Sequence, residues 1–269
     1  MAVVLDARNL NKHFGAITAA MNINAAIEQD SVVGLIGTNG AGKTTFINMI
    51  TGYIKPDTGS IVYQGRDITA LAPRAITRIG ICRSFQIPQL YASLSVFEHM
   101  MVGLGVVLRN AGLGGYFSRG QPIVPGHDAP APEVAERILE RFGLSDYRDK
   151  NAQVLPGGVR KLLDIALTMV AKPTILLLDE PTSGVSAEEK FGIMEMVMTA
   201  VKAEGATVLF VEHDMEVVSR FAQRVLAFYD GRIIADAAPE IVLSDPEVKR
   251  FVVGGELRRM EVQAGAAHA

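Results

Sequence analysis

The chain has 269 residues, of which 49% are hydrophobic and 20% are charged, so it can bury a sizeable core and is not a disordered protein. Lys and Arg number 26 against 29 Asp and Glu, and this net charge of −3 provides no basic surface for broad nucleic-acid binding. The only cysteine, Cys82, excludes an internal disulfide and suits a reducing compartment.

The N-terminal segment predicts a small sheet and no leader peptide. It lacks the basic region and apolar stretch of a signal peptide, and no uncharged apolar run reaches the roughly 20 residues that span a bilayer. We therefore expect a cytoplasmic chain that reaches membranes only through a partner. The short alternating segments 5–10 and 23–27, with a hairpin-like segment at 59–65, predict a small antiparallel sheet.

Residues 37–45, Gly-Thr-Asn-Gly-Ala-Gly-Lys-Thr-Thr, follow the apolar run 31–36 and precede a helical pattern, which is the arrangement of a phosphate-binding P-loop. Backbone N–H groups of the turn and the positive end of the helix dipole favour phosphate. We expect Lys43 to reach the β- and γ-phosphates of ATP and the Thr44 hydroxyl to ligate Mg²⁺. The residues predicted to bind the nucleotide here are Gly37, Asn39, Gly40, Ala41, Gly42, Lys43, Thr44 and Thr45.

Strand-length apolar runs continue along the chain at 80–85, 174–178, 207–211 and 225–229, and helical patterns separate several of them. This order predicts the α/β class, with a largely parallel sheet covered by helices. Residues 104–132 are rich in glycine and proline and predict a loop excursion within one domain. A helix is predicted at 133–142, and the tail at 258–269 is expected to fray.

Two adjacent acids, Asp179 and Glu180, end the apolar run 174–178. Acids at the end of a buried strand are costly unless they hold a cation or a reactant. Asp179 therefore suits Mg²⁺ coordination, directly or through water, and Glu180 suits polarisation of an attacking water. An ordinary acidic turn is the alternative for such a pair when no P-loop accompanies it.

Five motifs in this order resemble the ATP-binding cassette (ABC) ATPases of ABC transporters: the P-loop, Gln86, the segment 155–158, the segment 179–182 and His213. The resemblance covers about residues 5–255. The segments 212–215 and 245–256 are most similar to the ATPase subunits of branched-chain amino acid importers. The implied fold is a single P-loop NTPase domain over 1–255, with a parallel-sheet core, a small antiparallel β subdomain and a helical subdomain inserted at about 88–165.

The resemblance also implies roles for single residues. Phe14 matches the aromatic residue that stacks on adenine, although a core aromatic is an equal alternative from the residues alone. Gln86 matches the residue that ligates Mg²⁺, holds the attacking water and links the site to the membrane partner. His213 matches the residue that contacts the γ-phosphate and reports its loss.

The segment 155–159 departs from the family pattern. The family has Ser at the position of Pro156 and Gln or Glu at that of Val159, and proline supplies neither a hydroxyl nor an N–H. Gly157 and Gly158, which cap a helix predicted at 160–170, still offer N–H groups to the nucleotide held by a second subunit. Ser186 stands where Asp or Asn is common. Both departures fall on elements that serve the opposite nucleotide.

The resemblance implies an ATP-hydrolysing importer subunit at the cytoplasmic face of the inner membrane, with ATP and Mg²⁺ as cofactors. Its implied partners are a second ABC ATPase subunit in a heterodimer, two transmembrane permease subunits and, indirectly, a periplasmic binding protein, with no nucleic acid. The alternatives are a soluble ABC ATPase that acts in nucleic-acid repair or translation, and a regulatory cassette that binds ATP without turnover. The acidic balance and the intact Glu180 and His213 argue against these two.

Overall fold

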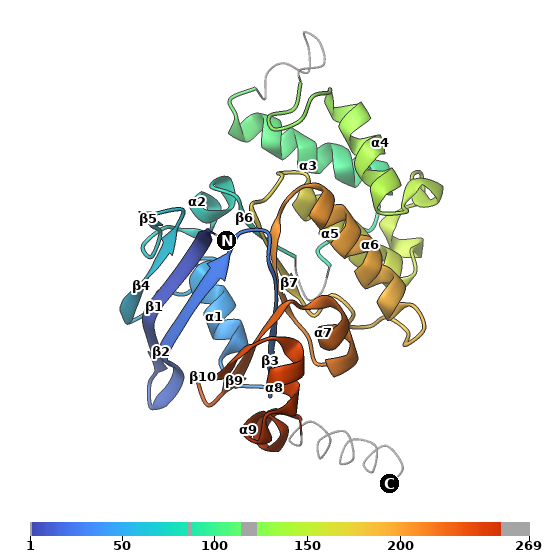
Figure 1. Ribbon diagram of the computed structural model, residues 1–269. Coiled ribbons are helices and arrows are strands. Elements are labelled where there is room, and N and C mark those ends of the chain that lie inside the picture. The colour runs from blue at the N-terminus through green and yellow to red at the C-terminus, as the bar shows by residue number, and fades with distance from the viewer. Residues whose placement is uncertain (1, 85–87, 114–122, 254–269) are drawn as a thin grey trace. The chain divides into compact units, whose positions relative to one another are not determined.

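A computed structural model describes residues 2–84, 88–113 and 123–253 of the chain (Figure 1). It divides into two compact units, the first formed by Met1–Ile81 with Thr207–Ala269 and the second by Cys82–Ala206. The predicted inserted segment at 88–165 falls within the second unit. Its bounds, and the extent of a single domain over 1–255, stay predictions.

The first unit contains the predicted antiparallel sheet, in the order β2-β1-β4-β5. Its strands are β1 (Val3–Phe14), β2 (Ile17–Glu28), β4 (Thr58–Tyr63) and β5 (Arg66–Asp67). The segments 5–10 and 23–27 lie in β1 and β2, as predicted, and both strands run on to their connecting turn. In β1, β2 and β4 residues two apart, such as Leu5 and Ala7 or Ile61 and Tyr63, are buried, as the period of two requires, whereas both residues of β5 are exposed.

A second set of strands in the first unit has the order β10-β9-β3-β8. The strand before the P-loop, β3 (Val32–Gly37), runs parallel to both β8 (Thr207–Val211) and β9 (Arg224–Tyr229), which confirms the predicted parallel core. The antiparallel strand β10 (Arg232–Ala237) was not predicted; it follows a two-residue turn at Asp230 and Gly231, both with positive φ. The helices of this unit are α1 (Lys43–Ile50), α2 (Pro73–Arg78), α7 (Met215–Phe221), α8 (Pro239–Ser244) and α9 (Pro246–Val248), and a π-helical turn, η4 (Lys249–Val253), follows α9.

The second unit is mainly helical. Its helices are α3 (Val96–Asn110), α4 (Ala131–Arg141), α5 (Gly157–Met169) and α6 (Lys190–Ala203), with short 3-10 turns at η2 (Ser145–Tyr147) and η3 (Ala152–Val154). The buried strand β7 (Ile175–Asp179) lies beside the short strand β6 (Ile81–Arg83), and the N–H of Ser84 donates to the carbonyl of Leu177 at 2.9 Å.

The predicted bounds of the loop at 104–132 are wrong at both ends, because the first residues belong to α3 and the last to α4. The helix α3 continues to Asn110 because it has a capping box between Ser95 and Glu98 and a buried apolar stripe that includes Leu104 and Leu108. These gains outweigh the roughly 1 kcal/mol that each glycine costs inside a helix. The helix predicted at 133–142 is confirmed as α4, which begins at Ala131.

The helix predicted at 160–170 is α5, and it begins three residues earlier, at Gly157. Pro156 is its N-cap, with φ −55° and ψ 154°. The correction has a simple reason, because proline fixes φ near the value of a helix start and the two glycines that follow it fit a tight first turn. Over the described residues, no helix is both long and apolar enough to cross a membrane.

Candidate functional site

The P-loop leaves the end of a strand that is buried from Val33 to Gly37. Two of its glycines are required by packing, because both have positive φ and neither has room for a side chain. A Cβ on Gly37 would lie 2.4 Å from the carbonyl oxygen of Phe228, and one on Gly42 would lie 2.8 Å from that of Ala19. Gly40 is exposed and has open space around it, so its backbone remains accessible to a ligand.

Lys43 begins α1 and is buried, with 5% of its surface exposed. Its ammonium donates to the carbonyl oxygens of Gly37 and, at 3.2 Å, Thr38, so it lies folded over the loop. The first N–H groups of a helix have no acceptor within the helix, and the dipole is positive at this end. The Lys43 ammonium and the first turn of α1 therefore concentrate positive charge at the loop, and the exposed Thr44 lies on that turn.

The loop is also anchored from behind. The N–H of Gly231 donates to the carbonyl of Ala41 at 3.0 Å, and the N–H of Met21 donates to the carbonyl of Gly231 at 2.7 Å. The turn between β9 and β10 thus joins the P-loop to β2. Sequence reasoning missed this anchor, although an Asp-Gly pair between two apolar runs is a known hairpin signal.

Phe14 lies at the end of β1 and 47% of its surface is exposed, so it is not the core aromatic that was its alternative. The ammonium of Lys12 lies 5.6 Å from the ring centroid and 2.6 Å from Oδ1 of Asp57. The hydrogen bond from Lys12 and the backbone N–H of His13 hold the pKa of Asp57 below its ordinary value. An exposed ring of this kind offers a flat apolar face on which a base can stack.

The acids at the end of β7 differ in their surroundings. Asp179 is buried, and its Oδ2 accepts a hydrogen bond from Arg83 at 2.5 Å. The ammonium of the buried Lys161 donates to the backbone carbonyl of Asp179 at 3.2 Å. Arg83 therefore compensates the charge of a desolvated carboxylate, and Lys161 fixes the backbone of the same residue.

Glu180 is half-buried and has a φ of +47°, in the left-handed region that costs a residue with a side chain about 1–2 kcal/mol. The N–H of Ser183 donates to its carbonyl at 3.1 Å and closes the turn. Backbone strain at a non-glycine residue is typical of functional positions. Lys172 and Asp230 have the same φ of +47°, so the strain alone assigns no role, and the catalytic role of Glu180 stays a prediction.

His213 follows β8 and is half-buried. The backbone N–H of His213 donates to Oε2 of the buried Glu212 at 3.2 Å. The Asp214 side chain caps α7 by accepting from the backbone N–H groups of Glu216 and Val217. Both neighbours of His213 are thus fixed, which limits the backbone freedom of the histidine. Gln86 lies outside the residues that the structure describes, so its predicted roles remain predictions.

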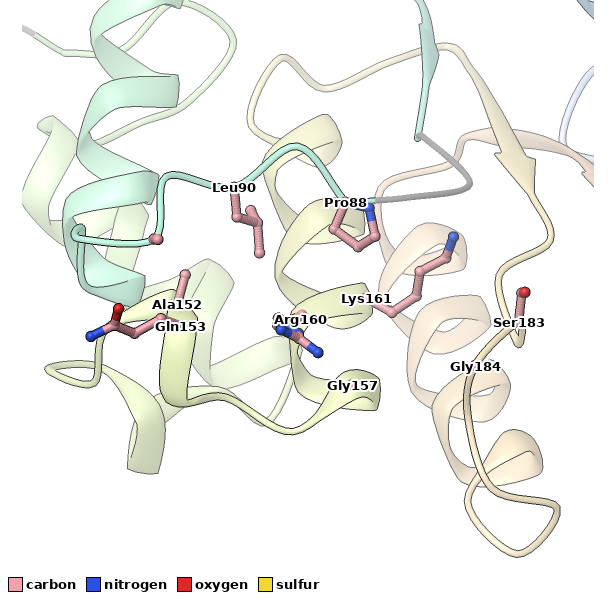
Figure 2. A pocket seen from close by; sticks show the side chains of 10 residues that line it. Pro88, Leu90, Ala152, Gln153, Gly157, Arg160, Lys161, Ser183 and Gly184 are labelled. Carbon is pink, nitrogen blue, oxygen red and sulfur yellow. The ribbon is translucent and has the colours of Figure 1, made fainter.

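A pocket of about 380 Å³ lies within the second unit, at the start of α5 (Figure 2). Figure 2 shows Pro88 and Leu90 at the top of the pocket, Gly157 at the bottom, and Ser183 with Gly184 on the right. Pro156 and Gly157 are exposed here.

A Cβ on Gly158 would lie 2.8 Å from Cδ1 of Ile193 on α6, so a side chain there would require the flexible end of Ile193 to shift. The Ser186 hydroxyl donates to Oε2 of Glu189 at 2.8 Å and is thus engaged within its own turn.

The predicted metal ligands fit magnesium in chemical type. Mg²⁺ prefers hard oxygen donors, and both the Thr44 hydroxyl and the Asp179 carboxylate are of this kind. The contact with Arg83 engages Oδ2, while a carboxylate has about four acceptor positions on two oxygens. Asp179 can therefore serve a metal and an arginine together.

A buried parallel strand that ends in this loop, with the lysine over the loop and a helix directly behind it, defines a P-loop nucleotide-binding protein. Residues 20–183 match the family model described as ABC transporter. The chain belongs to the ABC transporter family, its fold is that of an ABC ATPase cassette, and it is an ATPase.

Sequence similarity to several transport proteins extends over nearly the whole chain. It is 33% identical over 96% of its length to a probable branched-chain amino acid transport ATP-binding protein, LivG, of Archaeoglobus fulgidus, of which 98% is covered. It is 32% identical to the high-affinity branched-chain amino acid transport ATP-binding protein BraF of Pseudomonas aeruginosa, over 93% of this chain and 98% of that protein. A cassette of an ABC transporter solved in its ADP conformation is similar in structure, with a TM-score of 0.78 and 30% identity over 93% of this chain and 98% of that one.

Proposed function

We propose that the chain is the ATP-hydrolysing subunit of an importer that takes up branched-chain amino acids or related small polar solutes. The observation that carries this proposal is the near full-length similarity to proteins named as branched-chain amino acid transport ATP-binding proteins. The transported solute contacts other subunits, so the solute class is inferred through these relatives and not through residues of this chain.

The proposed partners are a second ABC ATPase subunit, two permease subunits in the membrane and, indirectly, a periplasmic binding protein. In this assembly the chain is peripheral, at the cytoplasmic face of the inner membrane. ATP binding closes the two ATPase subunits, and hydrolysis allows them to open again.

Each predicted site residue has a role that follows from its chemistry. The N–H groups of residues 37–45 and the Lys43 ammonium bind the β- and γ-phosphates, and Phe14 stacks on adenine. Thr44, Asp179 and Gln86 supply oxygen ligands for Mg²⁺, which neutralises phosphate charge when bound. Glu180 orients and activates the attacking water, and His213 hydrogen-bonds the γ-phosphate.

We further propose that the second ATPase subunit differs from this one. Pro156 has no hydroxyl to offer a nucleotide, and the Ser186 hydroxyl is engaged by Glu189. Two copies of this chain would therefore form two sites with weakened contacts across the dimer. A partner with serine at the position of Pro156 would complete the site on this chain.

Uptake measurements in the native host test the proposal. Deletion of the gene should abolish ATP-dependent uptake of radiolabelled leucine, and the wild-type gene but not E180Q should restore it. Parallel assays with urea, a short amide and an aromatic acid distinguish related solutes. Intact uptake of leucine in the deletion strain, with loss of one of the other solutes, would reject the branched-chain assignment.

A further inference from the structure

Arg83 and Asp179 form a largely buried ion pair at the edge where β6 and β7 end. Arg83 is the last residue of β6 and Asp179 the last residue of β7, and the guanidinium donates to Oδ2 at 2.5 Å. The side chains are only 15% and 11% exposed. The adjacent hydrogen bond from Ser84 to Leu177 fixes the two strands side by side.

The environment makes this contact strong and directional. In a site shielded from water, a hydrogen bond between two charged groups is shorter and about twice as strong as a neutral one. By comparison, Arg224 and Asp236, another pair joined at 2.5 Å, are 29% and 33% exposed and so are better screened by solvent. The contact with Arg83 fixes the rotation of the Asp179 carboxylate about its χ2 angle, which otherwise has a broad distribution.

We propose that Arg83 is a positioning residue that fixes the orientation in which Asp179 serves magnesium. This inference rests on the proposed function, in which Asp179 is a magnesium ligand. Arg83 occupies Oδ2 from the side of β6 and so directs the remaining acceptor positions of the carboxylate away from that strand. Because Mg²⁺ demands near-ideal octahedral geometry, a carboxylate that is held in one orientation binds it better than one that rotates.

The charge of Arg83 by itself has the opposite effect, because a cation beside the carboxylate repels a metal ion. A variant that conserves the charge separates the two effects. R83K keeps the positive charge but replaces the planar guanidinium by a shorter side chain with a single ammonium. R83K therefore loses the orientation of Asp179 while the repulsion stays.

The measurement is the affinity of the purified full chain for a fluorescent, non-hydrolysable ATP analogue, first in EDTA and then in millimolar MgCl₂. The dissociation constant in EDTA divided by that in MgCl₂ reports how strongly magnesium aids binding. R83K should lower this ratio about fivefold or more and leave the affinity in EDTA within about twofold. A purely structural role for Arg83 would change both affinities together.

Two further variants make the result specific. In a D179N background R83K should not change the ratio further, because the group that Arg83 orients is gone. The control is R224K, which makes the same chemical change in the pair with Asp236 on β9 and β10 and should leave the ratio unchanged. If R83K lowers the melting temperature too far for binding assays at room temperature, the variant and the unmodified chain are compared at a lower temperature at which both remain folded.

The outcomes are distinguishable. Arg83 is not a positioning residue if D179N lowers the ratio and R83K does not. The same conclusion follows if R83K lowers the ratio equally with and without the Asp179 carboxylate. In both cases the role of Asp179 as a magnesium ligand stands. If D179N itself leaves the ratio unchanged, Asp179 is not a magnesium ligand, and the inference falls with that part of the proposed function.

Discussion

The N–H of Gly231 donates to the carbonyl oxygen of Ala41 at 3.0 Å, which places the turn between β9 and β10 directly behind the phosphate-binding loop. The same residue accepts from the N–H of Met21 on β2 at 2.7 Å. One glycine thus connects three separate parts of the chain at the back of the loop. Its conformation is left-handed, with φ +74°.

Replacement of Gly231 by alanine should destabilise this connection. A Cβ there would lie 3.2 Å from the carbonyl oxygen of Thr18, in addition to the strain of positive φ. The control is G65A, because Gly65 has φ +78° and open space around it. We expect G65A to lower the melting temperature by about 2–4 °C and G231A by roughly twice that. Nucleotide affinity should fall only in G231A, and equal effects of the two variants would show that the anchor does not matter.

Removal of the Lys43 ammonium should weaken phosphate binding directly. Lys43 lies folded over the carbonyls of Gly37 and Thr38, so K43M removes a cation that is already in place. We expect a loss of nucleotide affinity of about tenfold or more, measured by the thermal shift that ATP causes. K55M is the matched control, because the Lys55 ammonium also donates to a backbone carbonyl, that of Leu71. A normal ATP shift in K43M would remove Lys43 from the binding site.

Glu180 should show a trade-off between stability and turnover. E180Q keeps the shape of the side chain and should retain ATP binding while turnover in the assembled transporter falls on the order of 10²-fold or more. E180G should lose turnover as well, yet relief of the strain at φ +47° should leave its unfolding free energy equal or up to about 1 kcal/mol higher. Near-normal turnover of E180Q would exclude Glu180 as the group that activates water.

Local patterns in the sequence were sufficient to predict the P-loop and the end of the strand β7. The glycine spacing, the lysine and the preceding apolar run act within nine residues, so propensity and burial point to the same structure. Asp179 and Glu180 were predicted as site residues because acids at the end of a buried strand are costly unless they hold a cation or a reactant. In both cases the interaction that decides the structure lies close in sequence.

Contacts between residues far apart in sequence could not be predicted in this way. Arg83 and Asp179 are 96 positions apart in the sequence, and the residues around Arg83 contain no pattern that predicts their ion pair. The length of α3 was missed for another reason. Its glycines suggested a loop, and only the burial of Leu104 and Leu108 in the folded unit shows why the helix continues.

The exchange of Pro156 for serine tests whether this chain works with an unlike partner. Pro156 is the N-cap of α5, and P156S adds a hydroxyl that can donate to a γ-phosphate oxygen held by another subunit. One hydrogen bond to a charged group contributes roughly 1.5–3 kcal/mol, so turnover of forced homodimers should rise about tenfold. In the native pair the effect should be smaller, because only one of the two sites uses this segment.

Serine can accept the N–H hydrogen bond that proline leaves unmade at this N-cap, but it loses the fixed φ of proline, so P156S should change stability by no more than about 1 kcal/mol whatever happens to turnover. The control is P130S, because Pro130 is the N-cap of α4 in the same unit and likewise lacks a side-chain cap. Both variants should change stability by similar small amounts, and only P156S should gain turnover. If the unmodified chain alone hydrolyses ATP as fast as the complete transporter, and P156S adds no more turnover than P130S, the two sites are not unequal and the heterodimer proposal is wrong.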